Sequence, residues 1–153
     1  MPSYELDDDP GRVDVDAVWN FLSTSAYWGR WREESVVRRQ VATAWRVVGA
    51  YHTEWGMVGF ARAISDGVAL AYLADVFVLP DHRGRGLGLA VVRRMVEEGP
   101  GARFRWLLHT RDGHGLYAKL GFAPPDLTLL ERPATLDPTA PSPSRNTNDT
   151  AGD

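Results

Sequence analysis

Apolar and polar residues follow a helical period in the first part of the chain. Apolar residues recur at i, i+3, i+4 and i+7 from Val15 to Leu22, and Asp14 stands where its side chain can cap the helix. Residues 32–44 repeat the pattern with a solvated face of arginine and glutamine. Two amphipathic helices are therefore expected before residue 45.

Strands are expected from runs of β-branched and aromatic residues. A short edge strand lies near Tyr4–Leu6, and longer runs at 45–51, 57–64 and 69–79 are joined by polar, glycine-containing turns typical of hairpins. The last run is apolar at nearly every position, so both of its faces should be covered. Its single charge is Asp75.

The chain then changes to a strand–helix–strand order. A helix over 87–98 ends at a Gly-Pro pair and leads to a strand at 104–109, and such a crossover makes the two strands parallel. A short helix over 114–120 follows, and Leu127–Glu131 is a candidate for a last strand. These elements predict an α/β fold of the α+β type, with a central mixed sheet and flanking helices.

Composition sets the domain boundaries that we expect. The chain has 153 residues, 44% of them hydrophobic and 24% charged, which is enough for one core. From Pro133 onward it consists mainly of Pro, Ser, Thr, Asn and Asp, which cannot bury apolar surface. We expect a single domain over 1–132 and a disordered tail over 133–153.

The most informative stretch is the glycine-rich turn between the strand at 69–79 and the helix that follows. It consists of Arg83, Gly84, Arg85, Gly86, Leu87 and Gly88. Glycine lets the backbone approach an oxyanion closely, the helix N-terminus offers unpaired N–H groups, and the two arginines add positive charge. The turn therefore predicts a phosphorylated cofactor.

Spacing excludes two common phosphate-binding motifs. Leu89 and Val91 stand where the two possible registers of a dinucleotide-binding G-x-G-x-x-G would need glycine or alanine. A P-loop needs a lysine directly after its last glycine, and the only lysine in the chain is Lys119. The pattern that remains is R-x-x-G-x-G, from Arg83 to Gly88, preceded by a Val-x-Pro sequence.

This pattern resembles the pyrophosphate-binding signature of the GCN5-related N-acetyltransferases (GNAT). A second segment, Leu116–Phe122, resembles the L-Y-x-K-x-G-F segment of the same family, and the two motifs occur in the family's order. The resemblance covers about residues 14–130. It implies a GNAT-like acyl-CoA N-acyltransferase fold, acetyl-CoA as co-substrate, and direct transfer of its acetyl group to a primary amine of a small molecule or peptide.

The resemblance also implies roles for residues of this chain. The backbone of Val76, Phe77 and Val78 would pair with the pantetheine arm of the cofactor, and the six residues of the glycine-rich turn would hold its pyrophosphate. Tyr117 matches the family tyrosine that protonates the departing thiolate; otherwise it is a half-buried aromatic residue on a short helix. Direct transfer needs no covalent enzyme intermediate, in agreement with the lack of cysteine.

Asp75 is the candidate base for the acceptor ammonium, because a carboxylate on a buried strand must face a cleft or be paired. The alternative is structural: Asp75 accepts hydrogen bonds from backbone or arginine and takes no part in the chemistry. Thr110 departs from the family pattern, which often has asparagine at this position.

An aromatic cluster of Tyr27, Trp28 and Trp31 follows the first predicted helix, in a segment that flanks the acceptor site in this family. These rings would form a wall for a flat or apolar acceptor or hold an amine cation against their faces. The alternative is that they close the core.

Charge and the N-terminal sequence bear on location and partners. The net charge of −3 is uneven, with six carboxylates against one arginine in residues 1–16 and three against one from Pro133, which leaves +4 for residues 17–132. That excess suits a polyanionic cofactor, but the basic residues form no run with interleaved aromatics, so we expect no nucleic-acid partner. No apolar run is long enough to span a membrane, and the first residues have neither the basic region nor the apolar stretch of a signal peptide, so we expect a cytoplasmic protein.

His109 and His114 are the only close pair of histidines, and their spacing matches no common metal motif, so no metal is expected. Other functions stay open: a non-catalytic coenzyme A sensor, or an enzyme that uses another acyl group or an oxygen acceptor. A homodimer through edge strands is also possible for this family.

Overall fold

The computed structural model describes residues 3–26 and 32–135. The chain forms two compact units, residues 1–123 and 124–153, and each is described by itself. The described part of the second unit, residues 124–135, contains no helix or strand, so the strand predicted at Leu127–Glu131 is wrong. Asp126 accepts a hydrogen bond from the Thr128 amide at 2.9 Å, and this local turn replaces the extended backbone that a strand requires. Most of the tail predicted to be disordered, residues 136–153, lies outside the described residues.

The first unit is built on one five-stranded mixed sheet, which confirms the predicted fold class. Its order is β1-β2-β3-β4-β5, and all neighbours pair antiparallel except β4 and β5, which are parallel. The strands are β1 (Tyr4–Asp7), β2 (Arg46–His52), β3 (Gly56–Ser65), β4 (Leu70–Val78) and β5 (Arg105–Leu108).

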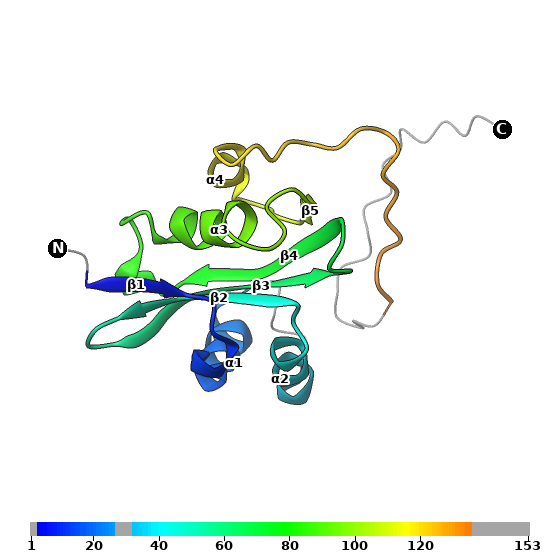
Figure 1. Ribbon diagram of the computed structural model, residues 1–153. Coiled ribbons are helices and arrows are strands. Elements are labelled where there is room, and N and C mark those ends of the chain that lie inside the picture. The colour runs from blue at the N-terminus through cyan, green and yellow to red at the C-terminus, as the bar shows by residue number, and fades with distance from the viewer. Residues whose placement is uncertain (1–2, 27–31, 136–153) are drawn as a thin grey trace. The chain divides into compact units, whose positions relative to one another are not determined.

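Helices cover both faces of this sheet. α1 (Val15–Thr24) and α2 (Glu34–Ala42) lie on one face, and α3 (Leu87–Glu97) lies on the other (Figure 1). The short α4 (His114–Ala118) follows β5. Asp14 accepts a hydrogen bond from the Ala17 amide and caps α1, as its position predicted. α2 begins two residues later than predicted, which leaves Arg32 outside the helix.

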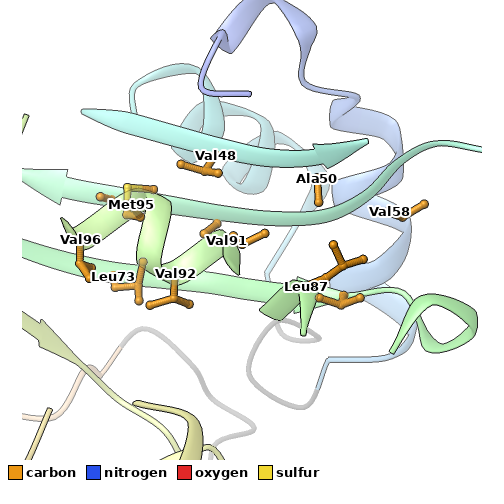
Figure 2. Packing of buried hydrophobic residues seen from close by; sticks show 12 residues of the cluster. Val48, Ala50, Val58, Leu73, Leu87, Val91, Val92, Met95 and Val96 are labelled. Atoms are coloured by element: carbon orange, nitrogen blue, oxygen red, sulfur yellow. The ribbon is translucent and has the colours of Figure 1, made fainter. Parts of the chain in front are cut away.

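The core consists of two hydrophobic clusters, one on each face of the sheet. On the α3 face, Val91, Val92 and Met95 are fully buried against strands β2 to β4 (Figure 2). On the opposite face the rings of Phe21 and Phe77 stack with centroids 4.2 Å apart. β4 contributes Leu73 to the first cluster and Phe77 to the second, so it packs apolar residues on both faces, which explains its nearly continuous apolar sequence.

Arg46 fixes the C-terminal end of α3 against the sheet. Its Nη1 donates to the carbonyl oxygens of Arg94, Met95 and Glu98 at 3.1, 2.8 and 2.7 Å. A cation there satisfies carbonyls that the helix leaves unpaired and opposes the negative end of its dipole. The opposite end of α3, which carries the glycine-rich turn, is therefore held at a defined place beside β4.

Candidate active site

A β-bulge in β4 opens the site. The register of β3 with β4 shifts between Phe60 and Arg62, and Asp75 opposite this shift has φ 54°. It is the only non-glycine residue with positive φ in the described part of the chain. A bulge bends its strand and increases the twist, and the parallel pairing of β4 with β5 ends at Leu73 and Leu108. Beyond that point the described strands offer β4 no partner on its β5 side.

A cleft of about 1160 Å³ occupies this region. Its volume exceeds the roughly 300–1,000 Å³ of ordinary small-molecule pockets, so it has room for a large ligand. Most of the site residues that the sequence predicts line it: Asp75, Val76, Phe77, Val78, Arg83, Gly84, Gly86, Leu87, Gly88 and Tyr117. Arg85 does not. Its guanidinium lies 6.0 Å from the ring centroid of Tyr4, in a separate small pocket.

The glycine-rich turn has the backbone that its sequence predicts. Gly84 and Gly86 have φ of 77° and 78°, a left-handed conformation that side chains with a Cβ rarely adopt, and Gly86 is the N-cap of α3. A Cβ added at either glycine would meet no atom within 4 Å, so this side of the turn is open. Backbone N–H groups of the first turn of α3 are thus available to an anion in the cleft.

Arg83 contributes to the shape of the turn as well as to its charge. Its Nε donates to the carbonyl oxygen of Val78 at 2.8 Å, which ties the turn to the end of β4. Among the described cleft residues, five are arginine or lysine (Arg32, Arg62, Arg83, Arg111 and Lys119) and two carry carboxylates (Asp75 and Asp112). The lining is therefore suited to a polyanion.

Tyr117 lies on α4 and faces the cleft, with its ring edge-on to Phe122 at 5.8 Å between centroids. Its position depends on Gly113, a residue that the sequence analysis did not single out. A Cβ at Gly113 would lie 2.9 Å from Cε2 of Tyr117 and 2.8 Å from Oγ1 of Thr110. Thr110 Oγ1 accepts a hydrogen bond from the Gly113 amide at 2.8 Å, so the threonine closes the turn before α4.

Asp75 is buried in an ion-pair cluster. Arg32 donates to it through both terminal nitrogens, at 2.9 and 2.7 Å, and Nε of Arg62 donates at 2.7 Å. Burial by itself raises the pKa of the Asp75 carboxyl group, but the hydrogen bond from Arg32 and the charge of Arg62 outweigh it and hold the pKa below its ordinary value. A carboxylate stabilised in this way is a poor proton acceptor, which favours the structural alternative for Asp75.

The sequence analysis gave no cofactor or substrate role to several further cleft residues. Gln40 accepts a hydrogen bond from Arg32 at 2.6 Å, and the Tyr72 hydroxyl is hydrogen-bonded to Nδ1 of His109. The sequence pattern predicted Arg32 as part of a helix, and Arg62 lies in a run that is typical of an ordinary strand. No local signal identifies their partner, because Asp75 lies 43 residues after Arg32.

The predicted aromatic wall of Tyr27, Trp28 and Trp31 lies outside the described residues and stays a prediction. The described residues hold no group of three or more His, Cys, Asp or Glu side chains placed to bind a metal ion. In the same part of the chain, no helix combines the length and the apolar character needed to cross a membrane.

Comparison with known proteins agrees with this architecture. A family profile described as "Acetyltransferase (GNAT) domain" matches residues 44–124. A GNAT-family protein of Xanthomonas campestris, known from its crystal structure, is 36% identical, with a TM-score of 0.78 over 88% of this chain and 95% of that one. A structure from Deinococcus radiodurans, 22% identical with a TM-score of 0.64 over 85% and 89% of the two chains, shares the fold.

Two curated relatives are similar over part of their length. A Gibberella zeae protein named as an acetyltransferase is 34% identical over 71% of this chain. The chloroplastic serotonin N-acetyltransferase 2 of Oryza sativa is 37% identical over 60%. The matches span 61% and 48% of the two relatives, so the chain covers about half to three fifths of their length. The family profile, the fold and the two motifs agree, and the chain belongs to the GCN5-related N-acetyltransferase family.

Proposed function

We propose that this chain transfers the acetyl group of acetyl-CoA directly to a primary amine of a small molecule or peptide. One observation carries the proposal: a single cleft joins an unpaired strand edge, a glycine-rich turn at a helix N-terminus, and a tyrosine. These three features would bind the pantetheine arm, the pyrophosphate and the thiolate of the cofactor, respectively.

Binding would follow from backbone geometry. The β5-side edge of Val76–Val78 would pair with the amides of the pantetheine arm as an added strand does. An N–H group at the bulge would point at the thioester carbonyl and stabilise the negative charge that develops on its oxygen. The turn from Arg83 to Gly88 would hold the pyrophosphate, and the charge of Arg83 would attract it.

Tyr117 would donate a proton to the thiolate as the thioester bond breaks. A phenol and a thiol hold their protons with similar strength, so the transfer is only slightly uphill. For Asp75 we propose the structural role, because its carboxylate is already engaged by two arginines. The acceptor ammonium would then lose its proton to water before attack.

A coenzyme A sensor without activity would need the glycine-rich turn but no tyrosine in the cleft, so Tyr117 favours an enzyme. The cleft residues place fewer constraints on the chemical identity of the acceptor than on that of the cofactor. The name of the rice relative makes an aromatic amine such as serotonin one candidate for the screen. Another acyl group or an oxygen acceptor would use the same cofactor contacts.

The test is calorimetric titration of the full chain with acetyl-CoA, followed by a thiol-release assay over a panel of amines, amino acids and alcohols. Micromolar binding with amine-dependent thiol release is expected. Binding without release from any acceptor would favour the sensor, and release with alcohols alone would identify an O-acetyltransferase. Failure to bind acetyl-CoA would contradict the proposal.

The turn itself can be tested with Gly86→Val. We expect acetyl-CoA affinity to fall at least about tenfold, because a β-branched residue disfavours the left-handed conformation that aims the N–H groups of α3 into the cleft. Gly67→Val is the matched control. Gly67 has φ 76° in the β3–β4 turn and does not line the cleft. Both variants should lose stability, and equal affinity loss in both would show that strain, not the phosphate contact, is responsible.

A further inference from the structure

Arg32, Arg62 and Asp75 form a buried cluster with one more positive than negative charge. Their exposed fractions are 6%, 6% and 7%, and all three line the cleft. Arg62 lies two residues after Phe60 on β3 and therefore on the face that α1 and α2 cover. This cluster thus forms one wall of the cleft on the face of the sheet opposite α3.

Neighbouring residues do not supply the missing negative charge. Gln40, which accepts a hydrogen bond from Arg32, is neutral. Asp112, the other carboxylate among the described cleft residues, is exposed on the loop before α4 and has no ion pair within the described part of the chain. The sequence from Tyr27 to Trp31 adds an arginine and no acid. A net buried charge is costly unless an anion compensates it.

The hydrogen bond to Asp75 does not use the two terminal nitrogens of Arg62. Its Nε is used by Asp75, but within the described residues neither of its terminal nitrogens makes a hydrogen bond. By contrast, both terminal nitrogens of Arg32 are taken up by Asp75 and Gln40. The two terminal nitrogens of a guanidinium form a planar fork that fits two oxygens of a carboxylate or phosphate group.

We propose that the acceptor carries an oxyanion, a carboxylate or a phosphate ester, which Arg62 binds. This inference rests on the proposed acetyltransferase function and names the class of acceptor: amino acids, peptides with a free carboxylate, and amino phosphates. The anion supplies the negative charge that the cluster lacks. A simple amine brings a like charge and no compensation, so it is a poor acceptor.

Matched acceptors test the inference in the thiol-release assay. Suitable pairs are tryptophan with tryptamine, lysine with cadaverine, and phosphoethanolamine with ethanolamine; the first two probe a carboxylate and the third a phosphate. We expect the wild type to prefer the anionic member of at least one pair. Arg62→Gln should reduce kcat/KM for that anionic acceptor about 10- to 100-fold, the typical effect of losing a hydrogen bond to a charged group. The kcat/KM for the simple amine of the same pair should stay the same or rise.

Two further variants separate recognition from folding. Arg62→Gln leaves Arg32 and Asp75 as a neutral pair, so acetyl-CoA affinity and the melting temperature should stay close to wild type. Arg62→Lys keeps the charge but not the fork and should show an intermediate loss. Arg93→Gln, on the exposed side of α3 and outside the cleft, should change nothing.

Opposite results would overturn the inference. The wild type would then turn over every simple amine at least as well as its anionic counterpart, or Arg62→Gln would lower kcat/KM equally for both members of a pair. A third such result is acetyl-CoA binding without thiol release from any anionic acceptor. Absence of acetyl-CoA binding in the wild type would overturn the proposed function as well, so the two failures are distinguishable.

Discussion

Replacing Tyr117 by phenylalanine should lower kcat about 10²- to 10⁴-fold, the usual contribution of a positioned general acid, and leave acetyl-CoA affinity unchanged. The ring would keep its place, because its edge contact with Phe122 and the close approach of Gly113 do not involve the hydroxyl. The variant removes the proton that the departing thiolate would receive. Single-turnover acetyl transfer and calorimetric titration measure the two quantities separately.

Tyr51→Phe is the matched control for deletion of a tyrosine hydroxyl. Tyr51 is buried in the cluster with α1, outside the cleft, and its hydroxyl has no hydrogen-bond partner in the described part of the chain. Its removal should leave kcat unchanged and cost no stability. A parallel loss of kcat and of cofactor affinity in Tyr117→Phe would mean that the tyrosine holds the cofactor and does not protonate it. With a thioester of a more acidic thiol, Tyr117→Phe should lower kcat less, because the thiolate of such a thiol is a better leaving group and depends less on protonation.

The parts of the fold that the sequence predicts are those encoded by neighbouring residues. The glycine-rich turn, for example, follows from steric rules at single positions, since Gly84 and Gly86 take the positive φ that other residues avoid. The crossover through α3 likewise follows from a change of hydrophobic period within one stretch of chain. Both were recognisable without knowledge of any distant contact.

The ion-pair cluster could not be predicted, because it depends on contacts between distant residues and on one unusual backbone angle. Asp75 has φ 54° in the middle of a strand, and no pattern of apolar residues reveals a bulge. Arg32 lies outside α2 and Arg62 belongs to β3, so the cluster exists only once the sheet and the helices have packed. For the same reason the sequence left two roles open for Asp75.

The position of the Arg85 side chain is a second property that the local sequence did not reveal. Its place in the turn implied a phosphate contact, but the left-handed backbone on either side of it, at Gly84 and Gly86, directs it toward Tyr4. The local sequence thus predicts a turn that could bind an anion, whereas contacts with the neighbouring strand determine where the Arg85 side chain lies.

Replacing Asp75 by asparagine should cost about 3–5 kcal/mol of unfolding free energy, the loss expected when a buried ion pair is broken from one side. Two buried guanidinium groups would then face each other without a counter-charge. Because a domain of this size is stable by only about 5–15 kcal/mol, the change should be obvious in urea unfolding. Asp16→Asn, which neutralises one of the two exposed partners of Arg38, should cost no more than about 1 kcal/mol. Arg62→Gln should cost much less than Asp75→Asn, because it leaves a neutral pair.

The pH dependence of this loss has a definite sign. The pKa of the Asp75 carboxyl group is lower in the folded state than in the unfolded chain, where an aspartate titrates near 3.9. Its stabilising effect is therefore complete above about pH 4 and disappears as the pH falls through the folded-state pKa. The difference in unfolding free energy between wild type and Asp75→Asn should shrink below about pH 4, whereas a constant difference would mean that packing and not charge is responsible. If Asp75 acts only through its two arginines, the pH profile of the activity that remains in Asp75→Asn should keep its shape. A shifted profile would restore Asp75 as the base.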